Sequence, residues 1–403
     1  MTTSSADVHP PPRPASEAVI DDALARVRPE RVVEITRALC AVRSPDGTEG
    51  PRAEVIAALL DRPGIEVEID PVLPGRPNVI ATVRGKGSGP GLLLNGHTDA
   101  VPYRADAWSR DPHEPWVEDG VIHGAAVTDM LGAIASMIAA VEVAADIEMP
   151  GDLVLLASMY HDTIGLGVKF ALSGEEQWPR FGICGEPSQM EIHTGNGGVA
   201  KFEVEFSGRT AHVSRIEESA DALAAAVDFA RALRDVKLDH EPHPRLTDLP
   251  RMLVGMVQGG DSPSGVAERA VVSGDIRTVP GMGRRALREQ LERVAHSACP
   301  SGVTPSLRFT AVQRAFIGPV AGPLVDALSS AHRRVVQREP VVTSRLPGQA
   351  FATDAADMQA LGVETVVYGP CDWHVVPDEA VPISELVDAS RVYLATALTL
   401  GTT

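Results

Sequence analysis

Short apolar runs alternate with longer alanine-rich segments over the first half of the chain. The runs at residues 78–84, 91–95 and 153–158 are rich in leucine and β-branched residues, which is typical of buried strands. Residues 53–60 and 131–145 have the length and composition of helices. This order predicts an α/β domain with a largely parallel sheet that helices cover on both faces.

The pattern changes near Gly195. The run K-F-E-V-E-F at residues 201–206 alternates polar and apolar positions, which indicates a half-exposed antiparallel strand. A helix, two strands, a second helix and a last strand follow, at residues 219–233, 252–257, 270–277, 284–295 and 306–310. Four strands and two helices predict an inserted α+β domain, after which the first pattern resumes. The predicted organisation is a tail at residues 1–16, an α/β domain at 17–195 and 313–403, and the insert at 196–312.

Length and charge narrow the classes of function. A chain of 403 residues with 44% hydrophobic content exceeds the size at which one domain usually stops growing. The 36 Lys and Arg residues against 54 Asp and Glu residues leave a formal charge of -18, which repels nucleic acid and anionic membranes. We therefore expect a small-molecule substrate, and neither nucleic acid nor a membrane as a partner.

The beginning of the chain, M-T-T-S-S-A-D-V-H-P-P-P, is polar and rich in proline. It lacks the apolar core of a secretory signal, and no long uninterrupted spanning run is evident after it, so we expect a disordered tail on a cytoplasmic protein.

The cysteines Cys40, Cys184, Cys299 and Cys371 form no C-x-x-C pair. Their scatter predicts neither a disulfide framework nor a cysteine-rich zinc site.

Polar residues that can carry chemistry follow the predicted strands, where open α/β sheets place their ligands. In L-L-L-N-G-H-T-D, the spacing of His97 and Asp99 allows the histidine to bind a metal while the carboxylate orients its ring. A loop histidine beside a solvated aspartate is the alternative. Asp129 in G-A-A-V-T-D-M-L-G precedes a helix and could equally cap it. Glu186 in I-C-G-E-P-S and His212 in R-T-A-H-V-S would, taken alone, more often be surface residues.

Taken in order, these motifs closely resemble the zinc-dependent amidohydrolase family that includes acetylornithine deacetylase, succinyl-diaminopimelate desuccinylase, aminoacylase and carboxypeptidase G. The resemblance covers nearly the whole chain after the tail and extends to further segments, W-S-R-D-P, V-E-D-G-V-I-H-G, G-D-I-R-T-V-P-G and A-T-D-A-A-D-M. It implies a zinc-binding α/β catalytic domain interrupted by an α+β lid domain that commonly dimerises. A homodimer through the lid domain is therefore expected.

The resemblance also implies roles for single residues. His97 and Glu186 would bind one metal and Asp129 would bridge to a second, while Asp99 would orient His97. Such a pair of ions, roughly 3.5–4 Å apart, activates water and polarises an amide carbonyl. Nitrogen and carboxylate ligands suit zinc, with cobalt or manganese as alternatives. His212, which lies in the lid domain, would stabilise the oxyanion of a tetrahedral intermediate. Arg277 would bind a carboxylate of the substrate.

The stretch S-M-Y-H-D-T-I-G departs from the family pattern. Family members carry D-E-E here, where the first glutamate is the general base and the second is a metal ligand. In this chain His161, Asp162 and Thr163 occupy those places. Asp162 can still accept a proton, but its carboxylate is about 1 Å short of the usual position, and Thr163 is a poor zinc ligand. The segment that usually supplies the last histidine ligand is shortened, and His374, its only histidine, is the candidate for that metal ligand.

Three interpretations follow. In the first, His161 replaces a missing ligand or acts as the base with help from Asp162, and the enzyme hydrolyses an amide or carbamate. In the second, His97, Asp129 and Glu186 hold a single ion. In the third, the chain is a non-hydrolytic relative that binds a ligand or catalyses a condensation or cyclisation. We favour a metal-dependent hydrolase that uses metal-activated water on a small carboxylate-bearing amide, such as an N-acyl amino acid or a peptide.

Overall fold

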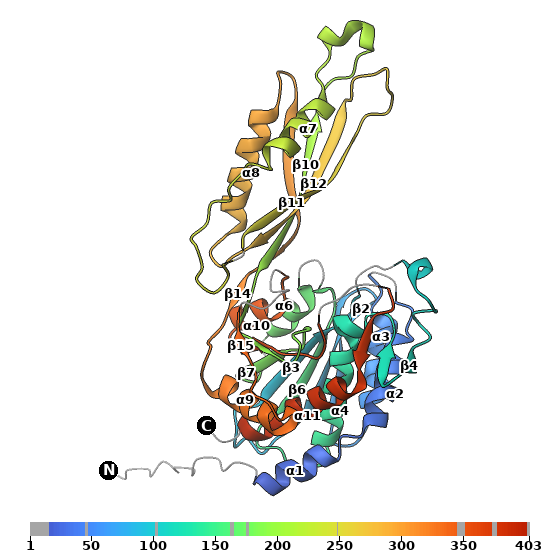
Figure 1. Ribbon diagram of the computed structural model, residues 1–403, viewed down its shortest axis with the longest axis vertical. Coiled ribbons are helices and arrows are strands. Elements are labelled where there is room, and N and C mark those ends of the chain that lie inside the picture. The colour runs from blue at the N-terminus through green and yellow to red at the C-terminus, as the bar shows by residue number, and fades with distance from the viewer. Residues whose placement is uncertain are drawn as a thin grey trace, which may run out of the picture. The chain divides into compact units, whose positions relative to one another are not determined.

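The computed structural model divides the chain into two compact units (Figure 1). It describes residues 16–44, 47–100, 104–161, 165–174, 177–247, 249–344, 351–372 and 377–400. The first unit comprises residues 1–194, 318–343 and 357–403, and the second comprises Gly195–Ile317 and Ser344–Ala356. The last of these segments, which the sequence pattern assigns to the α/β domain, is grouped with the second unit.

The first unit is built on an eight-stranded sheet in the order β1-β2-β6-β3-β7-β16-β8-β15. The strands are β1 (Glu66–Leu73), β2 (Arg76–Val83), β3 (Leu92–His97), β6 (Leu153–Ser158), β7 (Phe181–Cys184), β8 (Ile192–His193), β15 (Val342–Thr343) and β16 (Glu364–Val367). The four central strands β6, β3, β7 and β16 run parallel to one another. Strands β1, β2 and β6 pair antiparallel, so the sheet is mixed rather than parallel throughout. The predicted α/β class is confirmed.

Most helices of the first unit share one continuous hydrophobic cluster with the sheet: α1 (Glu17–Ala25), α2 (Pro29–Cys40), α3 (Gly50–Leu60), α4 (Gly132–Ala144), α9 (Pro323–Val336) and α11 (Ile383–Thr399). Two shorter helices are α6 (Leu166–Leu172) and α10 (Ala355–Ala360), of which α10 begins in the second unit. A small second sheet has the order β17-β5-β4, with strands β17 (Ala380–Pro382), β5 (Val121–His123) and β4 (Trp116–Glu118).

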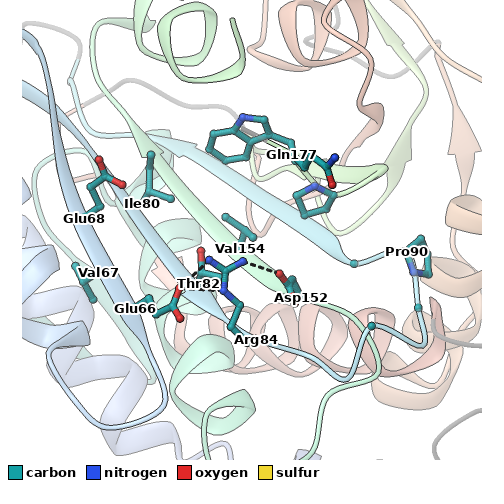
Figure 2. A pocket seen from close by; sticks show the side chains of 15 residues that line it. Glu66, Val67, Glu68, Ile80, Thr82, Arg84, Pro90, Asp152, Val154 and Gln177 are labelled. Carbon is teal, nitrogen blue, oxygen red and sulfur yellow. Dashed lines mark hydrogen bonds and ion pairs between the residues drawn. The ribbon is translucent and has the colours of Figure 1, made fainter. Parts of the chain in front are cut away.

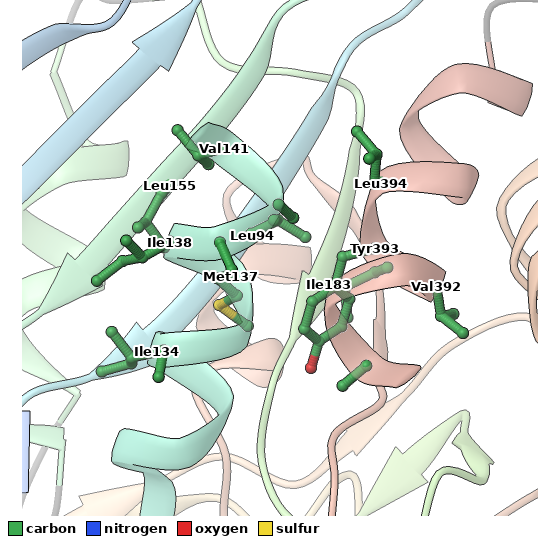
Figure 3. Close-up of a cluster of buried hydrophobic side chains, with 14 of the residues drawn as sticks. Leu94, Ile134, Met137, Ile138, Val141, Leu155, Ile183, Val392, Tyr393 and Leu394 are labelled. Carbon is green, nitrogen blue, oxygen red and sulfur yellow. The ribbon is translucent and has the colours of Figure 1, made fainter. Parts of the chain in front are cut away.

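Helix α4 lies at the centre of this core. All of its thirteen residues are buried, and Figure 3 shows Ile134, Met137 and Ile138 facing side chains of the sheet and of α11. The hydroxyl of Ser136 donates to the carbonyl oxygen of Leu386 on α11 at 2.9 Å. The stretch Val127–Ala144 has the length and composition of a membrane span, contrary to the expectation from the sequence, but every residue of it is buried inside the protein. A helix that is apolar on all sides is typical of such a central position.

The second unit contains a four-stranded antiparallel sheet in the order β11-β12-β10-β13. Its strands are β10 (Gly198–Ser207), β11 (Arg251–Gly259), β12 (Arg269–Thr278) and β13 (Thr304–Gln313), and its helices are α7 (Ala222–Ala232) and α8 (Arg284–Ala298). A further pair of short strands is β9 (Gly195–Asn196) with β14 (Phe316–Ile317). Phe202, Val204 and Phe206 enter a core that α7 and α8 share, while the glutamates between them are part-exposed. This α+β architecture confirms the fold predicted for the insert.

Candidate metal centre

The carboxyl ends of three parallel strands meet at one edge of the sheet. His97 is the last residue of β3, Glu186 follows β7 after Gly185, and His161 follows β6. Adjacent parallel strands deliver the residues after them to the same edge, which is where such sheets bind ligands. The three side chains are buried, with exposed fractions of 3% for His97, 2% for Glu186 and 8% for His161.

The donor atoms of these residues converge. Nε2 of His97 lies 3.7 Å from Oε1 of Glu186, and Nε2 of His161 lies 3.5 Å from the same oxygen. The two imidazole rings stack with their centroids 4.6 Å apart and an angle of 14° between their planes. One ligand atom from each of the three residues lies within 4.8 Å of the others. Two imidazoles and a carboxylate without thiolate are a donor set that fits zinc or a similar divalent ion.

Asp129 reaches the same place from a kink before α4. Its backbone is not helical (φ -133, ψ 88), and the N-cap position of α4 is occupied by Leu131 rather than by Asp129. Its Oδ1 lies 3.0 Å from Nε2 of His97.

Asp99 contacts both histidines. Nδ1 of His97 lies 3.0 Å from the backbone carbonyl oxygen of Asp99 and 3.7 Å from its carboxylate. The carboxylate accepts a hydrogen bond from the backbone N–H of His161 at 2.9 Å. The carbonyl oxygen, rather than the expected carboxylate, makes the short contact that keeps a proton on Nδ1 of His97 and directs the lone pair of Nε2 into the site. The carboxylate instead fixes the start of the turn that carries His161.

Charge in this cluster favours a cation. Burial by itself lowers the pKa of His97, but the hydrogen bond with Asp129 and the charges of Glu186, Asp129 and Asp99 outweigh it, so the pKa lies well above the ordinary value. Without an ion, His97 therefore holds a proton between buried carboxylates. Metal binding displaces such a proton, because only the neutral ring is a ligand.

Glu379 is a buried carboxylate that the sequence pattern did not assign to the site. It accepts hydrogen bonds from the backbone N–H of Thr128 at 3.2 Å and from the hydroxyl of Thr128 at 2.8 Å. Burial raises the pKa of Glu379 from 4.5 to about 7, and the bonds from Thr128 limit this rise. Glu379 thus anchors the segment that delivers Asp129. Glu379 and Thr128 are 251 positions apart in sequence, so no local motif signals their contact.

The remaining predicted site residues lie elsewhere. Asp162, Thr163 and His374 lie outside the described residues, and their roles stay predictions. His212 and Arg277 belong to the second unit. Nδ1 of the exposed His212 contacts the hydroxyl of Ser214 at 2.9 Å, and Nε of Arg277 pairs with Asp275 at 2.8 Å. Their roles toward substrate stay predictions as well.

A surface pocket of about 710 Å³ lies in the first unit (Figure 2). Arg84 lies among its lining side chains and pairs with Glu66 at 2.7 Å and Asp152 at 2.9 Å. None of the lining residues belongs to the buried cluster. Arg84 is already paired with these two carboxylates and the described residues of the lining include no histidine, so the pocket does not compete with the cluster as a metal site.

Comparison with known proteins assigns the chain to a family. The model described as "Peptidase family M20/M25/M40" matches residues 93–399. The chain belongs to this family. Among curated relatives, the acetylornithine deacetylase of Proteus mirabilis is 26% identical over 84% of this chain and 88% of the relative. The acetylornithine deacetylase of Photorhabdus laumondii is 30% identical over 57% of this chain and 60% of the relative.

Solved structures agree in fold. A dipeptidase from Saccharomyces cerevisiae superimposes with a TM-score of 0.78 at 15% identity, covering 95% of this chain and 98% of that one. A dinuclear metal-binding peptidase of the M20 family from Bacillus subtilis gives 0.69 at 19% identity, covering 93% and 99%. Membership of the M20/M25/M40 family confirms the predicted metal-dependent amidohydrolase and the use of divalent metal, and it does not favour a passive binding protein.

Proposed function

We propose that this protein is a zinc-dependent enzyme that hydrolyses the amide bond of a small, carboxylate-bearing N-acyl amino acid or dipeptide. The observation that carries this proposal is the convergence of His97, Asp129 and Glu186, all buried, at the carboxyl ends of the parallel strands. The curated relatives named as acetylornithine deacetylases and the solved dipeptidases support the substrate class. In this proposal Arg277 binds the substrate carboxylate and His212 stabilises the oxyanion.

The residues of the chain prepare the site for the ion. His97, Asp129 and Glu186 would hold it, and when bound it supplies a Lewis acid that polarises the amide carbonyl and lowers the pKa of water. The carbonyl of Asp99 keeps the proton on Nδ1 of His97, so that Nε2 is free to bind. Asp162 is proposed as the acceptor of the proton that water loses.

Metal analysis and turnover test this proposal together. Purified protein is freed of metal with a chelator, reloaded with zinc, cobalt or manganese, and assayed on a panel of N-acyl amino acids and dipeptides. We expect metal-dependent hydrolysis that Glu186→Gln lowers by at least about 100-fold, as is usual when catalytic machinery is removed. His296→Ala removes an exposed histidine of α8 and is the matched control. Less than about one ion per chain with no metal-dependent turnover would refute the proposal.

We further propose a homodimer that forms through the second unit. Strand β11 lies at the edge of its sheet, and Leu253, Met256 and Val257 on this strand are 65%, 51% and 40% exposed. An edge strand with exposed apolar side chains is a template for pairing with another copy. Light scattering after size-exclusion chromatography should give the mass of two chains for the wild type and of one chain for Leu253→Arg. A wild-type monomer at micromolar concentration would contradict this proposal.

A further inference from the structure

The spacing of three buried donor atoms matches a single ion. Zinc binds imidazole nitrogen at about 2.0–2.1 Å and carboxylate oxygen at about 2.0–2.2 Å, so ligand atoms in a tetrahedral site are about 3.4 Å apart. The distances from Oε1 of Glu186 to Nε2 of His97 and of His161 are 3.7 and 3.5 Å. Both rings therefore present a nitrogen to one carboxylate oxygen at the separation that a shared ion requires.

The backbone aims His161 at this place. Tyr160 has a φ of 55°, a left-handed conformation that residues other than glycine rarely adopt. This conformation turns the chain sharply between the end of β6 and His161. The backbone N–H of His161 is then held by the carboxylate of Asp99 at 2.9 Å.

A part-buried ion pair lies against the ring of Tyr160. The guanidinium of Arg76 lies 3.9 Å from the centroid of the Tyr160 ring. Glu49 is 1% exposed and holds Arg76 through both carboxylate oxygens, with Nε to Oε2 at 2.6 Å. A two-point guanidinium–carboxylate contact has a fixed geometry, so it fixes the plane on which the tyrosine rests. These contacts hold a histidine turn that the D-E-E pattern of the resemblance does not contain.

We propose that His161 is a ligand of the same ion as His97 and Glu186, and that Arg76 and Glu49 are positioning residues for it. This inference rests on the proposed function. It adds an imidazole nitrogen to the set of His97, Asp129 and Glu186, so the ion has two histidine and two carboxylate ligands. Because Nε2 of His161 serves as a metal ligand, His161 is not the general base. The additional imidazole should raise the affinity of the site for zinc and cobalt, which favour nitrogen ligands, relative to its affinity for manganese.

Cobalt and zinc titrations of the full-length protein test the inference without reference to turnover. We expect His161→Ala to weaken zinc binding more than the about 10–100-fold that is typical for loss of an orienting partner. The visible absorption of the cobalt form should change in the same variant. His161→Asp restores a carboxylate and should recover binding, with its preference moved toward manganese. His296→Ala should bind zinc like the wild type.

The positioning residues have their own readout. Arg76→Ala should weaken zinc binding by about 10–100-fold and change the cobalt spectrum, and Arg76→Lys should recover only part of the loss because lysine lacks the planar fork. A purely structural role would lower the thermal midpoint and leave the affinity of the folded protein unchanged. That result would overturn the assignment of Arg76.

A measurement on the wild-type protein tests the role of His161 even if the variants fail to fold. Histidine modification by diethyl pyrocarbonate, mapped by peptide mass spectrometry, should be suppressed at His161 by added zinc and unchanged at His296. Equal modification of His161 with and without zinc, or unchanged zinc affinity in His161→Ala, would overturn this inference while leaving the proposed function intact. A wild-type chain that binds no divalent ion would overturn both.

Discussion

Replacement of Glu379 by glutamine should change the pH dependence of stability. Glu379 is 5% exposed, and burial raises its pKa from 4.5 to about 7. The folded protein therefore binds more protons than the unfolded chain between these pH values, so stability falls as pH rises through this window. One unit of pKa shift corresponds to about 1.4 kcal/mol, so the ionised carboxylate costs the folded state about 3 kcal/mol above pH 7.

Glu379→Gln removes this cost and keeps an oxygen that can accept from Thr128. At pH 4.5 the wild-type carboxyl is already protonated, so both proteins make neutral hydrogen bonds with Thr128 and their stabilities should be similar. Above pH 7 the variant should instead be the more stable protein. The free energy difference between the two proteins should therefore change by about 3 kcal/mol between pH 4.5 and 8.

The assay is denaturant unfolding of the chelated proteins at a series of pH values, with the exposed Glu68→Gln as the control for general pH effects. Chelation keeps the ion from changing the charge near Asp129. A difference that stays constant from pH 4.5 to 8, or that changes in the opposite direction, would refute the assignment of a buried carboxyl to Glu379.

Three further results are expected. Burial lowers the pKa of His193 from 6.5 to about 4. The stability that the neutral ring contributes is therefore fully present above pH 6.5, and about 3 kcal/mol of it is lost as the pH falls to 4. In acid unfolding curves, the free energy of unfolding of His193→Asn should fall less over this range than that of the wild type. Gly167→Ala would place Cβ 2.6 Å from backbone atoms of Met159 and should cost about 1–3 kcal/mol in urea unfolding, whereas Gly255→Ala, whose nearest atom is 4.0 Å away, should cost less. Zinc at about 100 times its Kd should stabilise the protein by about 2.7 kcal/mol, and a melting curve that a chelator leaves unchanged would contradict a site of this affinity.

The regular elements follow closely from the sequence because their patterns are local. Strand β6 has the predicted limits, and α4 lies within one residue of them, since an unbroken apolar or alanine-rich run leaves few other ways to satisfy the backbone. Strand β1 is harder to predict because it lies at an edge, contains Pro71 and buries few side chains.

In the candidate site, too, some residues can be predicted from local motifs and others depend on contacts between distant parts of the chain. His97, Asp129 and Glu186 stand in motifs that the sequence displays, so their convergence could be expected from the order of strands and the resemblance. The turn at Tyr160 depends on a tertiary contact with Arg76, and the segment before Asp129 depends on Glu379. Neither support has a spacing that a sequence pattern can reveal, because both partners are distant along the chain.

Helix α4 also constrains how the chain can be made. Its partner α11 begins about 240 residues later, so at about 5–20 residues per second a ribosome needs roughly 12–50 s to deliver the cover for this helix. Throughout that time an apolar segment with the composition of a membrane span lacks α11 on one side. The nascent chain therefore depends on chaperones, or on early contacts with α2 and β6, to avoid aggregation before synthesis reaches α11.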